Sequence, residues 1–501
     1  MSRFFSPYRR ASSGPAVTVA RAVFASLCLA WCVGCDDADP PPPPVSYAPK
    51  PLIVVAAGDV DGRLEATACK SERPGGLARR TQAIEGLRTG YAPVIVDVGG
   101  AGHGEAAYDR LVWEQQLRGE IALGVAAHDL GREEAALTAE FRAALAARTA
   151  IPWVSSNVRD ASGAYLTEPL RVVERDGRTI VVLGLLSASR APQGVTIDDP
   201  HGAIRSVLRD YDWLKRRPDA LVVLIDAPRD EAESLLTTSP PGAIVFRRGE
   251  HDAAAGEVAT TSRETRRTRL VDVPPRGEGL ALVERCEAPE QTPSQDTPDP
   301  SRWVVRIEAL DDRTQLARPP AVVAFQREAA RGGFVASDLT SRFIGLPNLE
   351  TLRKPGVPDA PEFHRYAGSE SCRHCHRQES LTCDTGPHAR AWQTLIDRGA
   401  QHDVRCQQCH TTGFGAGEET GGFVSAKLTS RATAVRCEAC HGPSAGHVVE
   451  PTVPTTWHAA QACGMCHDRE HSPGFLFDDA WLRIRHGERP ADTTSDTGPR
   501  L

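Results

Sequence analysis

The chain has 501 residues, a length that suits two or three domains rather than one. Apolar residues make up 41% and charged residues 25% of it, so it can bury a core and is not disordered throughout. Its net charge is −7 with both signs mixed along the sequence, which excludes the clustered basic face of a nucleic-acid-binding protein. We therefore expect no nucleic-acid partner.

The first 35 residues have the pattern of an export signal. Arginines lead into a 12-residue apolar run, Ala22 to Val33, which is shorter than the roughly 20 residues that span a bilayer. The following Gly34 and Cys35 resemble a bacterial lipoprotein cleavage site and imply a lipid anchor at Cys35, although Cys32 stands where leucine is usual. Ordinary signal cleavage nearby is the alternative. Both predict an exported protein of the periplasm or cell envelope.

A proline-rich linker over residues 36–50 separates this signal from residues 51–312, where strand and helix patterns alternate. Such alternation is typical of a layered α/β domain. Residues 313–362 form a connector with one expected helix, Pro319–Arg331. The expected strands are Leu52–Ala56, Val94–Val98, Thr179–Leu185 and Ala220–Ile225, and the expected helices are Gly76–Leu87 and Glu133–Arg148.

Residues 363–490 hold 9 of the 14 cysteines and 12 of the 16 histidines. Four C-x-x-C-H motifs occur there; this is the attachment motif of c-type haem, in which the adjacent His is an axial ligand of the iron. Because few long apolar runs are present, we expect a mostly helical, loop-rich region whose four haems c form its core, followed by a polar tail over residues 491–501. The attachment cysteines are Cys372, Cys375, Cys406, Cys409, Cys437, Cys440, Cys463 and Cys466, and the axial histidines are His376, His410, His441 and His467.

Zinc sites or disulfides are the alternative use of these cysteines. Zinc ribbons pair C-x-x-C units but do not require a His directly after each second Cys, and an oxidising compartment oxidises free thiolates. All four motifs have that His, so haem is favoured. Outside the motifs, a disulfide between Cys69 and Cys286 is one option, and Cys383 is expected to pack near the first haem.

The second axial ligand of the irons is expected to be histidine. The chain has two methionines, of which Met1 leaves with the signal and Met465 lies inside the fourth motif. Bis-histidine ligation is typical of low-spin electron-transfer haems, since it leaves no position open for a substrate. Seven histidines are available for four positions: His364, His388, His402, His447, His458, His471 and His486.

Segments around these motifs resemble the multihaem cytochrome c family that includes the tetrahaem electron acceptor of hydroxylamine oxidoreductase. Examples are Tyr366-Ala-Gly-Ser-Glu-Ser-Cys372, Gly386-Pro-His388-Ala389 and Glu470-His471-Ser-Pro-Gly-Phe475. The resemblance covers residues 363–488 and implies electron transfer by hopping from haem to haem. It implies that His388 and His447 are distal ligands, each serving a haem other than its neighbour in sequence. It also implies a third distal His, either His486 or His471. Members of that family can leave one haem five-coordinate, and the second motif is the candidate for such a haem.

Residues 51–312 resemble the calcineurin-like metallophosphoesterases, especially their exported 5′-nucleotidase branch, in Val54-Val-Ala-Ala-Gly58-Asp59-Val-Asp61 and Ile151-Pro-Trp-Val-Ser-Ser-Asn157. That family clamps phosphate with two metal ions. Its ligand motifs are degenerate here: Asp61 and Asp226 replace histidines, Gly100 replaces the bridging Asp, Ala127 replaces an Asn, and Arg248-Gly249-Glu250-His251 keeps at most one His. The resemblance implies a relic that serves as scaffold or docking surface. A single-metal site from Asp59, Asp61, His128 and His251 is the alternative.

These features together predict an exported, lipid-anchored tetrahaem cytochrome c that exchanges electrons with unidentified redox partner proteins. Two other functions stay open. One is a redox enzyme that reduces a small substrate at a five-coordinate haem. The other is a working metallophosphohydrolase with a fused electron-transfer domain.

Overall fold

The computed structural model describes residues 50–65, 74–250, 262–265, 268–286, 302–310, 318–335, 338, 349–468, 471–472 and 474–486. The expected export signal, the lipid anchor at Cys35, the pairing of Cys69, the ligand His251 and the C-terminal tail lie outside these residues. No helix within them has the length and apolar character needed to cross a membrane.

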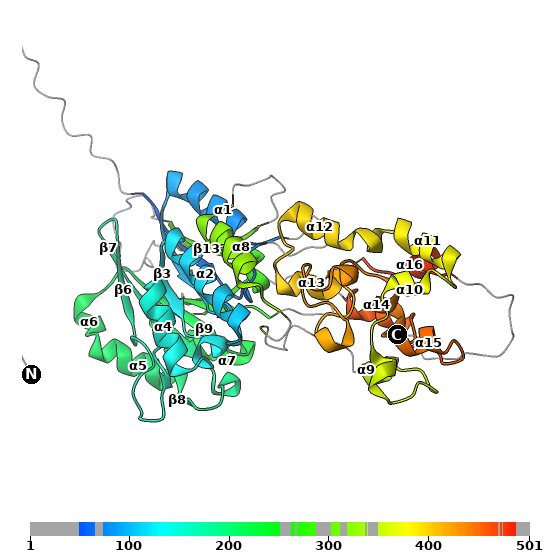
Figure 1. The fold of residues 1–501 in the computed structure, drawn as a ribbon. Coiled ribbons are helices and arrows are strands. Elements are labelled where there is room, and N and C mark those ends of the chain that lie inside the picture. Colours follow the sequence, from blue (N-terminus) through cyan, green and yellow to red (C-terminus); the bar gives the residue numbers. More distant parts are fainter. Residues whose placement is uncertain are drawn as a thin grey trace, which may run out of the picture. The chain divides into compact units, whose positions relative to one another are not determined.

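The first of two six-stranded sheets runs in the order β14-β13-β1-β2-β3-β4. Two of its strands, β3 and β13, are labelled in Figure 1. Its centre is parallel, with Val54 of β1 opposite Val94 of β2, whereas β13 joins β1 in the antiparallel direction. Both central strands are buried on both faces, which explains their nearly continuous apolar sequence. The strands are β1 (Leu52–Ala57), β2 (Ala92–Asp97), β3 (Val125–Asp129), β4 (Trp153–Val154), β13 (Gly279–Cys286) and β14 (Arg302–Ala309).

The second sheet runs β11-β12-β10-β9-β7-β6, with β7, β9, β10 and β12 parallel to one another. Val54 and Val96 of the first sheet share one buried apolar cluster with Val222 and Phe246 of the second, so the two sheets pack face to face. The strands are β6 (Arg171–Arg175), β7 (Arg178–Leu186), β9 (Ala220–Asp226), β10 (Ile244–Arg248), β11 (Ser262–Thr265) and β12 (Thr268–Val273).

Helices cover the outer face of each sheet, so the layers run helix, sheet, sheet, helix. The first sheet is covered by α1 (Leu77–Gly90), α2 (Ala107–Leu123) and α8 (Pro320–Gly332), and the second by α5 (Pro200–Asp210) and α7 (Arg229–Thr238). The strands expected from the sequence are confirmed, as are the helices expected at 76–87 and 319–331, with small shifts at their ends.

The single helix expected at Glu133–Arg148 is wrong, because the chain forms two helices there, α3 (Arg132–Ala135) and α4 (Ala139–Thr149). Thr138 begins α4: its hydroxyl accepts a hydrogen bond from the Phe141 backbone N–H at 3.3 Å and donates one to Glu105 at 2.9 Å. This N-cap stabilises a new start and separates the two helices.

Residues 349–486, called the haem region below, form short helices joined by loops. Four buried apolar clusters are present among the described residues, and only Val404 of the haem region belongs to one of them. The expected fold class is confirmed: a layered α/β region followed by a mostly helical, loop-rich region. The helices are α9 (Leu349–Leu352), α10 (Ser369–Cys372), α11 (Arg377–Thr385), α12 (Ala391–Arg398), α13 (Val404–His410), α14 (Cys437–His441), α15 (Ala445–Val449) and α16 (Phe477–Ile484).

Candidate functional site

Each C-x-x-C-H motif lies on or beside a short helical turn. The second motif forms the end of α13, and the third motif is the whole of α14. The first motif begins at the last residue of α10, and the fourth begins within the 3₁₀ turn η9 (Gln461–Met465). In the first and fourth motifs the backbone N–H of the histidine donates to the carbonyl of the first cysteine at 2.9 Å. One helical turn thus gathers two thiols and an imidazole, as covalent haem attachment requires. The nine cysteines of the haem region are free of disulfide bonds.

Three motif histidines each face a second histidine ring from a distant part of the chain. The ring centres are 6.1 Å apart for His376 and His447, 6.0 Å for His467 and His388, and 5.9 Å for His441 and His486. Two metal–nitrogen bonds of about 2 Å, with roughly 1 Å from each nitrogen to its ring centre, place two axial rings about 6 Å apart. The residues present therefore fit an iron between each pair.

Hydrogen bonds fix the orientation of these rings. The Nδ1 atoms of His410, His447 and His486 lie 2.7–2.9 Å from backbone carbonyl oxygens. Such bonds leave Nε2 available as a metal ligand. Burial lowers the pKa of His441 to about 4, with help from Lys354, and burial also lowers the pKa of His388, His410 and His467. The rings of these four histidines are thus neutral near pH 7, the form that binds a metal.

The two C-terminal histidines differ in their surroundings. His471 lies in an exposed turn with its Nδ1 2.9 Å from a carboxylate oxygen of Asp468, whereas His486 faces a motif ring. His410 of the second motif differs from the other three, because no histidine of the described residues faces it at the separation of the three pairs.

The cysteines arrange the motifs in two pairs. The Cys437 thiol of the third motif is in hydrogen-bond contact with Cys372 of the first, and Cys409 of the second motif contacts Cys466 of the fourth in the same way. Cys383 also contacts Cys437, so it lies where the first and third motifs meet. The first and third motifs are therefore neighbours, as are the second and fourth.

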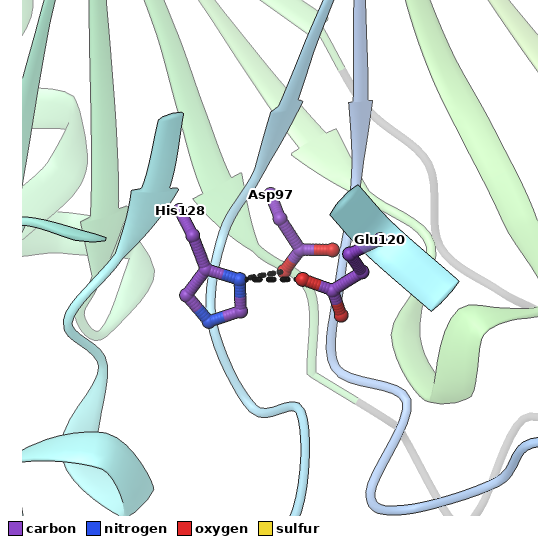
Figure 2. Close-up of side chains that lie close together, drawn as sticks. All are labelled: Asp97, Glu120 and His128. Atoms are coloured by element: carbon purple, nitrogen blue, oxygen red, sulfur yellow. Dashed lines mark hydrogen bonds and ion pairs between the residues drawn. The ribbon is translucent and has the colours of Figure 1, made fainter. Parts of the chain in front are cut away.

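One group of three potential metal ligands is present among the described residues, and it lies in the α/β region. His128 Nδ1 is 2.7 Å from Glu120 Oε2 and 3.8 Å from Asp97 Oδ1 (Figure 2). Arg80 Nη1 lies 3.5 Å from the other oxygen of Asp97. Against the effect of burial, the Glu120 carboxylate raises the pKa of His128 well above its usual value, so the ring is a cation. His128 and Glu120 thus form a buried ion pair, and the group supplies its own positive charge.

The residues at the degenerate phosphoesterase motifs follow the carboxyl ends of the parallel strands. They are not gathered as one metal site: Asp59 pairs with Arg248, Asp61 with His103 at 2.8 Å, and His128 with Glu120. The sequence comparison identified the lost ligands but not the arginine among them. Two arginines, at 247 and 248, follow the apolar residues 244–246 of this buried strand, and the second of them is the one among the lost ligands.

The second motif is bound to the α/β region by a buried polar contact. Tyr108 of α2 donates a hydrogen bond to Asp403 at 2.7 Å, and the same carboxylate pairs with Arg405 at 2.9 Å. Arg405 also donates to the carbonyl of Gly62 in the loop after β1, at 2.7 Å. The motif begins at Cys406, directly after Arg405, so the α/β region holds the start of the second attachment site.

Residues 371–442 match the family model of cytochrome c554 and c-prime. The haem region resembles cytochrome c554. Cytochrome c-554 of Nitrosomonas europaea is 29% identical over 100 residues, which are 17% of this chain and 40% of that protein, so the match spans less than half of the relative. The resemblance expected from the motifs is confirmed, and it supports a multihaem c-type electron carrier with covalently bound haem c.

The α/β region resembles the metallophosphoesterase fold, as expected. A 5′-nucleotidase precursor from Thermus thermophilus has a TM-score of 0.45 and 15% identity, over 70% of this chain and 68% of that one. The calcineurin-like phosphoesterase YfkN from Bacillus subtilis has a TM-score of 0.43 and 15% identity, over 56% of this chain and 97% of that one. These values describe a likeness of fold.

Proposed function

We propose that this protein is an exported, lipid-anchored tetrahaem cytochrome c that passes electrons between redox partner proteins. The observation that carries the proposal is the set of three histidine pairs at 5.9–6.1 Å, each joining a C-x-x-C-H histidine to a ring from another segment. The proposed pairs are His376 with His447, His467 with His388 and His441 with His486. His410 is proposed as the single axial histidine of the second haem.

The residues of the haem region have separate roles in this function. When bound, haem supplies an iron that cycles between Fe(III) and Fe(II). The motif thiols would hold the group covalently, and the paired imidazoles would bind the iron and exclude small molecules from it. Cys372 lies beside Cys437, and Cys409 lies beside Cys466, so the groups attached at these cysteines would be neighbours within each pair.

The test is a haem count and spin-state analysis of the full-length protein matured with the attachment machinery. A pyridine haemochrome assay should give four haems c per chain. Electron paramagnetic resonance of the oxidised protein should show three low-spin haems and one high-spin haem. A count below four would refute the tetrahaem proposal, and four low-spin haems would refute the five-coordinate assignment at His410.

A second candidate function is reduction of a small substrate at the second haem. The observation in its favour is the lack of a partner ring for His410 among the described residues. Adding cyanide or nitric oxide separates the two functions. An electron carrier should bind such ligands at one haem without catalytic consumption of nitric oxide by the reduced protein, whereas steady turnover would favour the enzyme.

A further inference from the structure

Arg248, the last residue of β10, places its guanidinium group among three carboxylates from separate elements. Its Nε lies 2.6 Å from Asp59 Oδ1, after β1, and its Nη1 lies 3.3 Å from Asp226 Oδ2, at the end of β9. Glu133 of α3 accepts a further hydrogen bond from Nη1. The Arg248 side chain is 6% exposed and that of Asp226 is fully buried. A cation therefore already lies where the carboxylates converge.

Each of the three carboxylates already has an arginine partner without an added ion. Asp226 pairs with Arg190 at 2.5 Å, and Arg190 also pairs with Glu250. Glu133 pairs with Arg132 at 2.7 Å, and Asp59 pairs with Arg248. Although burial alone would raise it, Arg248 and Arg190 hold the pKa of Asp226 below its usual range, so the carboxylate is ionised. Buried charges are tolerated when they are paired in this way. A divalent cation would have to displace an arginine to bind.

Gly100 shows that the arginine and the expected bridging aspartate exclude each other. A Cβ atom at position 100 would lie 2.8 Å from both Cζ and Nη2 of Arg248, and 3.0 Å from the Cα of Asp59. The backbone there has a φ of +77°, which favours glycine. In the phosphoesterase pattern the carboxylate that bridges two metal ions stands at this position. The residues present therefore do not fit a metal pair.

We propose that Arg248 is an internal substitute for the metal ions of a phosphoesterase-type site. Its guanidinium neutralises Asp59, Glu133 and Asp226, and the cleft takes no divalent cation while the arginine is present. The three carboxylates remain a latent site, because oxygen ligands are those that Mn²⁺ prefers. The proposal concerns the α/β region and is independent of the haem function.

The test measures Mn²⁺ binding by the full-length holoprotein. Wild type should retain no Mn²⁺ after equilibration with an excess and gel filtration, and its melting temperature should be the same in Mn²⁺ and in EDTA. Arg248→Ala should retain Mn²⁺ and melt at a higher temperature with Mn²⁺ than with EDTA, since a ligand that binds the folded state stabilises it. Haem iron measured in the same samples gives the number of chains.

The matched control is Arg247→Ala, which removes the neighbouring buried arginine of β10. Its guanidinium faces Asp272, with Nε 2.6 Å from Oδ1, and not the three carboxylates. This variant should lose stability and gain no Mn²⁺. Retention of Mn²⁺ by wild type, failure of folded Arg248→Ala to gain it, or an equal gain in Arg247→Ala would each overturn the proposal.

A second pair of variants covers the case in which Arg248→Ala does not fold. Gly100→Asp alone should lower the melting temperature, because the new side chain meets the guanidinium. Adding Arg248→Gln to it should recover part of the loss, since the shorter neutral side chain removes the clash and leaves a polar group in the cleft. Additive losses in this double-mutant cycle would overturn the claim that the two positions exclude each other.

Discussion

Replacement of Tyr108 by Phe tests the buried contact between the α/β region and the second haem motif. The substitution removes only the hydroxyl that donates to Asp403 at 2.7 Å. The ring keeps its edge-on packing against Phe325 and Phe334, with ring centres 5.9 and 5.4 Å away. Any loss of stability therefore reports the hydrogen bond and not a cavity.

The size of the expected loss of stability follows from the hydrogen bonds that Asp403 keeps in the variant. The same carboxylate oxygen still accepts hydrogen bonds from the backbone N–H and the Nε of Arg405, at 2.9 and 3.1 Å, so the charge is not left unpaired. The cost is thus that of one charge-assisted hydrogen bond, about 1.5–3 kcal/mol, and not the ~3–5 kcal/mol of an orphaned buried charge. For a region of this size, each kcal/mol lowers the melting temperature by roughly 2–4 °C.

The assay is thermal unfolding followed by circular dichroism in the far ultraviolet, with Tyr91→Phe as the control. Tyr91 also donates to a carboxylate, Glu284, but at 3.3 Å and in a partly exposed position, so its loss should cost within about 0.5 kcal/mol. The same far-ultraviolet signal follows both variants, so they can be compared directly.

The effect of Tyr108→Phe should also depend on pH in a defined way. Burial raises the pKa of Tyr108 well above its usual value, and Arg405 holds the pKa of Asp403 below its usual range despite burial. The stabilisation that Tyr108 contributes to the folded state is present below the unfolded tyrosine pKa of about 10 and is lost as pH rises above it. The stabilisation that Asp403 contributes is present above about pH 4 and is lost as pH falls below it. The difference between wild type and variant should be largest between these limits. A cost no greater than that of Tyr91→Phe, or one that is flat from acid to alkali, would refute this reasoning.

Further predictions concern the haems and the α/β region. His486→Met should leave four haems attached and raise the reduction potential of one of them, because thioether ligation favours Fe(II). His471→Met should change neither the number of haems nor any reduction potential. Equal spectra for the two variants would contradict the proposed pairing. Cys440→Ser should remove one thioether bond and lower the denaturant midpoint followed at the Soret band, and an unchanged midpoint would count against haems as the core. Burial raises the pKa of Asp97 to about 8, so the free energy of unfolding of the wild type should fall as pH rises from about 4 to 8. Asp97→Asn should reduce this dependence on pH. Parallel curves of stability against pH for the two proteins would contradict the prediction. The full-length protein should not hydrolyse nucleotides or aryl phosphates with Mn²⁺, and turnover that Asp59→Asn abolishes would disprove this.

The parts of this protein that were predictable from sequence are those fixed by local pattern. Strands such as β1 follow from short apolar runs, and the grouping of each motif's cysteines and histidine follows from their fixed spacing on a single helical turn. The break between α3 and α4 was missed, because the N-cap at Thr138 depends partly on Glu105, which is remote in sequence.

Most of what could not be predicted from the sequence concerns contacts between residues that are far apart in the chain. Spacing could not decide between His471 and His486, since the choice depends on how α16 returns toward α14. Likewise, the motifs showed that Gly100 had lost its carboxylate, but only the folded structure shows Arg248 beside it. Each of these contacts joins residues on different elements, and no local rule of spacing determines it.

The position of His486 after α16 has a consequence for how the protein matures. A chain exported from its N-terminus delivers all four attachment motifs, and the rings of His388 and His447, before this last histidine arrives. On the proposed pairing, the iron above His441 is the last of the three paired irons to complete its coordination. Loss of the final helix to a protease would then turn that iron into an open, reactive centre while every thioether bond stays intact. On the proposed pairing, an intact α16 would therefore decide whether the third haem is closed to dioxygen and other small molecules.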